Sequence, residues 1–114
     1  MGSYVAHLPT MVIDSGFASS SVLTGFEDAA SISIMAPASL TGTITVRIAT
    51  ESSGVTASST WADLQSGGSD VTIGAGNSVT ITPPTAHSLI LVSGTTETAR
   101  RYFQVTKRFN VGNG

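Results

Sequence analysis

Strict alternation of apolar and polar residues is clearest in residues 40–64, around which the rest of the chain is organised. Ile44, Val46 and Ile48 occupy every second position, and the residues between them are polar or small. Because side chains alternate between the two faces of a strand, this run predicts a strand with one buried face. A loop rich in serine and threonine, residues 52–60, then leads to a return strand over residues 61–65, which carries the only tryptophan, Trp61.

Further short apolar runs are separated by glycine, proline and serine, which favour turns. They cover residues 20–23, 30–35, 71–73, 79–81, 87–93 and 100–111. The run 87–93 is almost continuously apolar, which predicts a central strand buried on both sides. We expect residues 66–70 to form a tight turn with positive φ angles, and residues 74–77 to form the loop of a hairpin between the strands that flank them.

The spacing of these runs predicts an all-β fold. About seven or eight short strands with turn signals roughly every 8–12 residues are typical of a single antiparallel β-sandwich, of either jelly-roll or immunoglobulin-like type. Residues 1–13 contain Pro9, which cannot donate to a strand ladder. We therefore expect residues 1–13 to form an edge segment or an extended N-terminal arm, and residues 14–114 to form the β-sandwich domain.

The composition narrows the classes of function. Charged residues make up 11% of the chain, against about 25% in typical soluble domains. This composition suits a surface covered by neighbouring subunits, and it suits equally an uncharged polar β-protein. No apolar run reaches the roughly 18–20 residues of a membrane span, so no membrane partner is expected. The absence of cysteine excludes disulfides and thiolate zinc sites.

No spacing typical of catalysis or metal binding occurs in the chain. The serines lack the Gly-x-Ser-x-Gly pattern of a nucleophile elbow. The two histidines, His7 and His87, lie far apart in sequence and have no carboxylate or histidine neighbours at ligand spacing. We expect neither an enzyme nor a cofactor.

Charge is segregated along the chain. All seven acidic residues precede residue 98, with Arg47 as the only base among them, so this part carries a net charge of −6. The other four bases give the end of the chain +4, and they are Arg100, Arg101, Lys107 and Arg108. Within one subunit this pattern fits an exposed edge strand with charged gatekeepers. Between subunits it fits head-to-tail contacts or docking on an acidic protein surface. Nucleic-acid binding is not favoured at a pI of about 5.4.

Four segments carry a resemblance to a known group of proteins: LTGTITVRIATESSG, then TWADLQSGGSDVTIGAGNSVTITP, then SLILVSG, and RYFQV. They lie within the run from Ser39 to Val105, and this run resembles small virion structural proteins of tailed bacteriophages. The resemblance implies a non-enzymatic capsid decoration or cement protein that stabilises the shell through subunit contacts. It also implies a homo-oligomer, with a trimer favoured, that binds the major capsid protein or other virion proteins. Collar, tail or fibre component is the alternative location, and in each case the protein would be made in the host cytoplasm and reside in the virion.

Under this resemblance the N-terminal arm and the basic strand make the contacts between subunits. The interface residues expected from this hypothesis are Tyr4, Val5, His7, Leu8, Pro9, Arg100, Arg101, Lys107 and Arg108. The strand at residues 44–49, the Ser-Ser-Gly turn at residues 52–54 and the return strand with Trp61 also resemble discoidin and fibronectin type III sandwiches. These include carbohydrate-binding modules, so a carbohydrate- or receptor-binding module is a second alternative. Trp61 would then stack on a ligand, although a single tryptophan on a strand is more often a core residue. Exposure of Trp61 beside planar polar groups would favour the ligand-stacking role.

Overall fold

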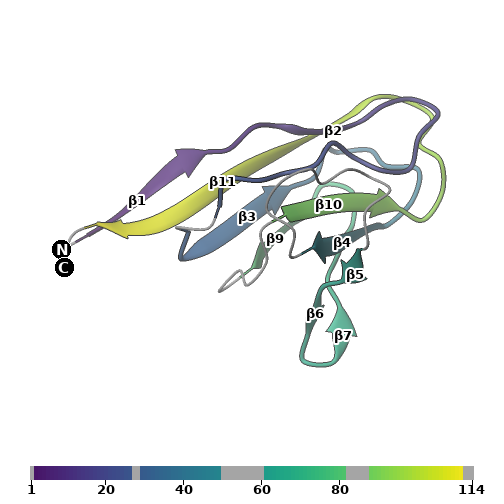
Figure 1. The fold of residues 1–114 in the computed structure, drawn as a ribbon. Helices are drawn as coiled ribbons and strands as arrows, with labels where there is room; N and C mark the ends of the chain where they lie inside the picture. The colour runs from purple at the N-terminus through teal and green to yellow at the C-terminus, as the bar shows by residue number, and fades with distance from the viewer. Residues whose placement is uncertain (1, 27–28, 50–60, 82–87, 112–114) are drawn as a thin grey trace.

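The computed structural model describes residues 2–26, 29–49, 61–81 and 88–111 (Figure 1). These residues form antiparallel strands and no helix, which confirms the all-β class. The loop 52–60 and His87 lie outside the described residues. The strands are β1 (Gly2–His7), β2 (Met11–Ile13), β3 (Ser31–Met35), β4 (Ile44–Ala49), β5 (Ala62–Asp63), β6 (Gln65–Ser66), β7 (Ser69–Asp70), β8 (Thr72–Ile73), β9 (Ser78–Ile81), β10 (Ser88–Ser93) and β11 (Arg101–Val111).

The first sheet is built around β11. Its strand order is β1-β11-β3-β9, and β2 also pairs with β11. Phe103 and Val105 of β11 are buried, as are Ile32 and Ile34 of β3, so alternate residues of both strands face the core. The interpretation of the basic last strand as an edge strand is wrong, because β11 is hydrogen-bonded to β1 and β2 on one side and to β3 on the other.

The second sheet has the order β10-β4-β5, and β8 pairs with β4 as well. Ile44 and Val46 are completely buried as predicted, whereas Ile48 is only half-buried and Ala49 is buried in its place. The predicted burial of β10 on both faces is confirmed, since Leu89, Ile90 and Leu91 are all at most 2% exposed. Residues 19–23, at a predicted strand, make two isolated bridges to β10 instead of a continuous strand.

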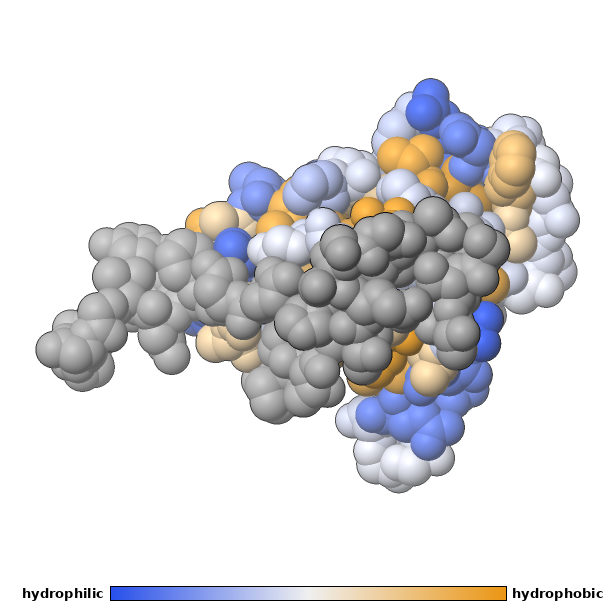
Figure 2. Space-filling model, in the orientation of Figure 1, coloured by the Kyte–Doolittle hydropathy of each residue, from blue (hydrophilic) through white to orange (hydrophobic). Residues whose placement is uncertain are grey.

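One edge of β4 is covered by a strand in two pieces. β5 and β8 both pair with β4, and the chain between them forms the projecting hairpin β6–β7. Gly67 and Gly68 at the tip of this hairpin have φ angles of 64° and 86°, which confirms the predicted turn with positive φ. The hairpin is exposed and hydrophilic (Figure 2).

The hairpin predicted around residues 74–77 is wrong. β8 before these residues pairs with β4 in the second sheet, whereas β9 after them pairs with β3 in the first sheet. The turn is tight, since Asn77 N donates to Gly74 O over 3.0 Å. It is fixed to the end of β3 by hydrogen bonds from Ala36 N to Asn77 O and from Gly76 N to Pro37 O. Residues 74–77 are therefore a corner between sheets.

A bulge separates β1 from β2. Leu8 N donates to Val105 O, and the next pair on the same edge is Met11 with Phe103. Two residues, Pro9 and Thr10, therefore lie opposite the single residue Gln104, which is the pattern of a β-bulge. Proline is tolerated there because it has no ladder bond to donate. The predicted arm is not confirmed, because residues 2–7 and 11–13 pair with β11 of the same chain.

Side chains from both sheets meet in one core. Its residues from the first sheet are Met11, Ile13, Ile32, Ile34, Ile81, Phe103 and Val105, and those from the second are Ile44, Val46, Ile73, Leu89 and Leu91. Phe26 and Leu23 from the connecting segments complete it. The described strands number eleven, more than the predicted seven or eight, because the N-terminal segment supplies β1 and β2 and the projecting hairpin adds β6 and β7. β1 and the end of β11 extend from the core as a two-stranded ribbon (Figure 1).

Candidate interaction surface

The face of the first sheet that points away from the core exposes large apolar side chains. Val5, Met35 and Tyr102 are 60%, 57% and 51% exposed. Their strand registers place them on one face, because Val5 lies opposite Arg108, Met35 lies opposite Gln104, and alternate residues of β11 share a face. Much of the rest of this face is serine and threonine, including the hydrogen-bonded pair Ser33 Oγ and Thr80 Oγ1, 3.0 Å apart.

The pairing of β1 with β11 brings two predicted interface segments together. The predicted arm residue Val5 lies opposite Arg108, His7 lies opposite Thr106, and Tyr4 pairs with Phe109. Leu8 is half-buried and packs against the core, whereas Pro9 at the bulge is exposed. The arm and the basic strand are thus neighbours in space, although about 100 residues separate them in sequence.

The four bases of the last strand have different surroundings. Arg100 is exposed, with its Nε 2.9 Å from Asp14 Oδ1 and its guanidinium 5.6 Å from the centre of the Tyr102 ring. Lys107 Nζ donates to Gly25 O over 3.4 Å, and Arg108 lies on the exposed face opposite Val5. Arg101 is largely buried and forms an ion pair with Glu97. Arg100 and Arg101 therefore pair with acids of their own chain, and the charge segregation of the sequence is partly cancelled in space.

Glu97 is a completely buried carboxylate that the sequence analysis did not single out. Oε1 accepts hydrogen bonds from Thr41 N and from Arg101 Nε, both at 2.8 Å. Oε2 accepts from Gly42 N at 3.0 Å and from Ser93 Oγ at 2.6 Å. The glutamate joins the β3–β4 connection to the β10–β11 connection.

The surroundings of Glu97 favour its ionised form. Burial alone opposes ionisation, but the hydrogen bonds from Ser93, Thr41, Arg101 and Gly42 outweigh it and lower the pKa of Glu97 from 4.5 to about 2. Position 42 requires glycine, because a Cβ there would lie 2.6 Å from Ser93 Oγ and 2.9 Å from Thr95 N. The Glu97 side chain stabilises the loops at this end of the molecule and is inaccessible to a substrate.

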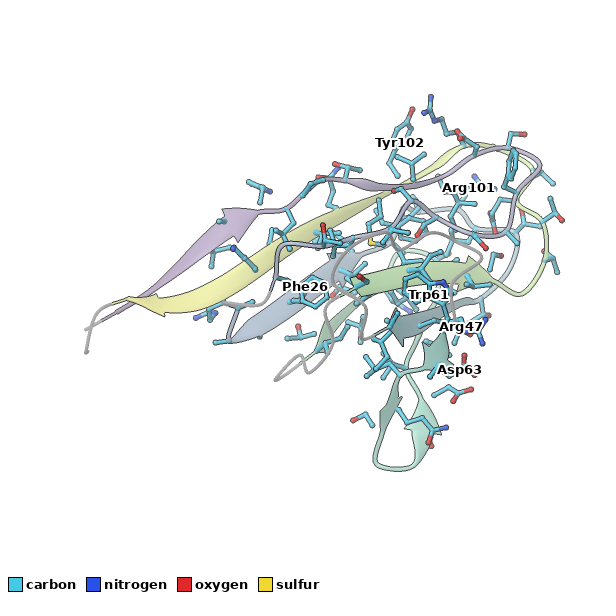
Figure 3. The ribbon with its side chains drawn as sticks, in the orientation of Figure 1. Phe26, Arg47, Trp61, Asp63, Arg101 and Tyr102 are labelled. Atoms are coloured by element: carbon cyan, nitrogen blue, oxygen red, sulfur yellow. The ribbon has the colours of Figure 1, made fainter. Side chains whose placement is uncertain are left out.

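Trp61 does not belong to the core, contrary to the more common role of a single tryptophan on a strand. It is partly exposed at the start of β5, and its carbonyl accepts a hydrogen bond from Arg47 Nη2 at 3.5 Å. Arg47 Nε also donates to Asp63 Oδ1 at 2.8 Å, and both side chains are more than a third exposed. The Arg47 guanidinium therefore contacts both the Asp63 carboxylate and the Trp61 main chain, and the Trp61 side chain beside them in sequence is partly exposed (Figure 3).

Within the described ranges, no group of three or more histidine, cysteine, aspartate or glutamate side chains is placed to hold a metal ion. The same residues contain no helix long and apolar enough to cross a membrane.

Comparison with known proteins adds no family: no protein-family model, curated protein or solved structure matches the chain.

Proposed function

We propose that this chain is a non-enzymatic structural protein of a tailed-bacteriophage virion. The role that we favour is that of a capsid decoration or cement protein. The observation that carries this proposal is the outward face of the first sheet, on which Val5, Met35 and Tyr102 are each more than half exposed. Large apolar side chains exposed on one face are a feature of protein interaction sites. The low charge of the chain fits a surface that neighbouring virion proteins cover. A collar, tail or fibre location would use the same face.

The two sheets that share one core support a further proposal, a jelly-roll sandwich in preference to an immunoglobulin-like one. A jelly roll has eight strands in two four-stranded sheets, and successive strands cross between the sheets. Here β8, β9, β10 and β11 alternate between the second and the first sheet. The bridges from residues 19–23 to β10 supply a fourth member of the second sheet. Because jelly rolls build viral capsid and lectin domains, this topology suits a virion protein.

Incorporation into particles tests the proposed function. Particles produced from the encoding genome are purified, and the chain is measured in them by quantitative mass spectrometry. We expect a fixed ratio of the chain to the major capsid protein, and we expect particles without the chain to lose their contents at lower temperature, because a ligand of the assembled shell stabilises it. The double substitution Val5→Ser with Tyr102→Ser should abolish incorporation. Phe17→Ser, which also removes an exposed apolar side chain, is the control and should leave incorporation unchanged. Absence of the chain from the particles would contradict the proposal.

A carbohydrate- or receptor-binding module is the second candidate, and the placement of Trp61 favours it. The partly exposed Trp61 side chain offers a stacking surface, and the Arg47–Asp63 pair, which also contacts the Trp61 carbonyl, offers hydrogen-bonding groups for sugar hydroxyls. A glycan array with the purified chain, followed by titration of any hit, tests this function. Trp61→Ala should abolish binding, whereas Tyr102→Ala should leave it unchanged. Absence of any glycan signal would contradict this candidate.

A further inference from the structure

β1 is the last strand at its edge of the first sheet. It pairs with β11 over all six of its residues, and no described strand pairs with its other side. Beyond Arg108, β11 pairs with β1 and with no other described strand, so these two strands leave the core as a ribbon. Figure 1 shows this ribbon running to the two chain ends. Two strands by themselves are marginally stable in water, and further strands stabilise them.

The sequence of β1 lacks the features that usually protect an edge strand from pairing. Edge strands are commonly short, or carry lysine, other charges, proline or a bulge. β1 reads GSYVAH, with no Lys, Arg, Asp, Glu or Pro over six residues. Its bulge comes only after the strand has ended, at Pro9. Val5 in its middle is apolar and 60% exposed. This edge is therefore suited to accept another strand.

The register fixes which backbone groups of β1 point outward. Leu8 N donates to Val105 O, so Leu8 belongs to a hydrogen-bonded pair. Hydrogen-bonded and non-hydrogen-bonded pairs alternate along an antiparallel ladder. Ala6 therefore bonds to β11, whereas the N–H and C=O groups of Ser3, Val5 and His7 point to the open edge. These three residues span the strand symmetrically around Val5.

We propose that β1 pairs with β1 of a second copy of this chain, antiparallel and around a two-fold axis at Val5. In this arrangement Val5 lies opposite Val5 of the second copy, and Ser3 lies opposite His7. The outward groups then form about six backbone hydrogen bonds, and the first sheets of the two copies become one continuous sheet. The second copy is the partner because this symmetric pairing is self-complementary and leaves no free β1 edge, so the assembly closes as a dimer.

The charges around the paired strands are compatible with this dimer. Arg108 lies opposite Val5 within each chain, so the two copies of Arg108 are separated by three strand spacings, or about 14 Å. The Debye length is about 8 Å at physiological ionic strength, so their repulsion is largely screened. We therefore expect the dimer to persist at high salt, unlike a head-to-tail assembly based on charge. The dimer is also distinct from the trimer that the resemblance implies.

The first test is the mass of the purified chain by sedimentation equilibrium, at low and high salt and over a range of concentrations. We expect a monomer–dimer equilibrium that salt does not weaken. Val5→Pro should give a monomer that still unfolds cooperatively, because the Val5 N–H points away from β11 and no bond within the chain is lost. A wild-type trimer or a monomer at all concentrations overturns the pairing. Since incorporation into particles is measured separately, this outcome would leave the proposed virion role intact.

The second test uses the absence of cysteine from the chain. Residues opposite each other in a hydrogen-bonded pair have Cα atoms about 5.5 Å apart, within the range that a disulfide bridges. Val5→Cys should form a disulfide-linked dimer at least about tenfold faster than Phe17→Cys, because pairing raises the effective concentration of the two thiols. Phe17 is the matched control, since it is 62% exposed in the loop after β2. Equal rates for the two variants would overturn the proposal.

Discussion

At the scale of single residues, Glu97 shows how a buried charge is accommodated in a chain that has few charges. Four donors, two from the β3–β4 connection and two from the adjoining ends of β10 and β11, saturate its two oxygens. Glu97→Gln should therefore cost about 3 kcal/mol, because it leaves Arg101 without its anionic partner in a largely buried position. Urea unfolding at neutral pH measures this loss. The control is Asp63→Asn, which removes an exposed pair with Arg47 and should cost less than about 1 kcal/mol. Equal losses for the two variants would contradict the role of Glu97.

The same residue should make stability depend on pH. The pKa of Glu97 is about 2 in the folded chain against 4.5 as its ordinary value, a difference worth about 3 kcal/mol. Because folding lowers this pKa, the stabilisation is complete above about pH 5 and is lost as the pH falls from 4.5 to 2. Urea unfolding between pH 2 and pH 7 should show this decline in the wild type, and a shallower one in Glu97→Gln. Parallel curves would show that other carboxylates cause the acid sensitivity.

At the scale of elements, β6–β7 is a hairpin inserted into a strand. Val71 N donates to Leu64 O over 2.8 Å, so the two ends of the insertion are already adjacent. Replacing residues 65–70 by Asn-Gly should keep β5 and β8 on β4, because this pair favours the two-residue turn that such a bond closes. We expect the melting temperature to change by less than about 4 °C, measured by circular dichroism.

The control replaces residues 74–77 by the same Asn-Gly pair. This corner connects β8 of the second sheet to β9 of the first, so a hairpin turn there forces two strands that belong to different sheets to pair. The melting transition should be lost or strongly lowered. If both replacements behave alike, the assignment of one turn as an insertion and the other as a corner is wrong.

These two turns also show how far the sequence predicts the fold. Alternation correctly predicted the burial of Ile44 and Val46 in β4, because it reports directly which side chains face the core, but it failed at Ile48, where Ala49 is buried instead. The turn at residues 74–77 has the glycine and asparagine of a hairpin loop, and local turn chemistry cannot tell whether the next strand pairs with the last one or crosses to another sheet. The buried role of Glu97 could not be predicted from the sequence. Its partners at residues 41 and 42 are distant in sequence, and its spacing to Arg101 is informative only within a helix.

At the scale of the whole molecule, the N-terminal segment has two parts with different surroundings. β1 lies on the ribbon, with Val5 and His7 exposed. β2 contributes two side chains to the core, Met11 and Ile13, which are 1% and 0% exposed. The bulge at Pro9 separates the two parts, so β1 can vary without affecting the core packing, whereas β2 cannot. This division allows one end of the sheet to serve assembly while the other supports the fold.

Two truncated chains test this division. A chain that begins at Pro9 loses β1 and retains Met11 and Ile13, so we expect cooperative thermal unfolding with a modest loss of stability. A chain that begins at Asp14 also loses these two buried side chains, each worth about 2–5 kcal/mol. Since small domains have only about 5–15 kcal/mol of net stability, the second chain should be largely unfolded. Circular dichroism with thermal melting distinguishes the two. If the chain that begins at Asp14 melts as cooperatively as the other, residues 9–13 are dispensable to the fold, and the expected division between an arm of residues 1–13 and a domain of residues 14–114 is supported instead.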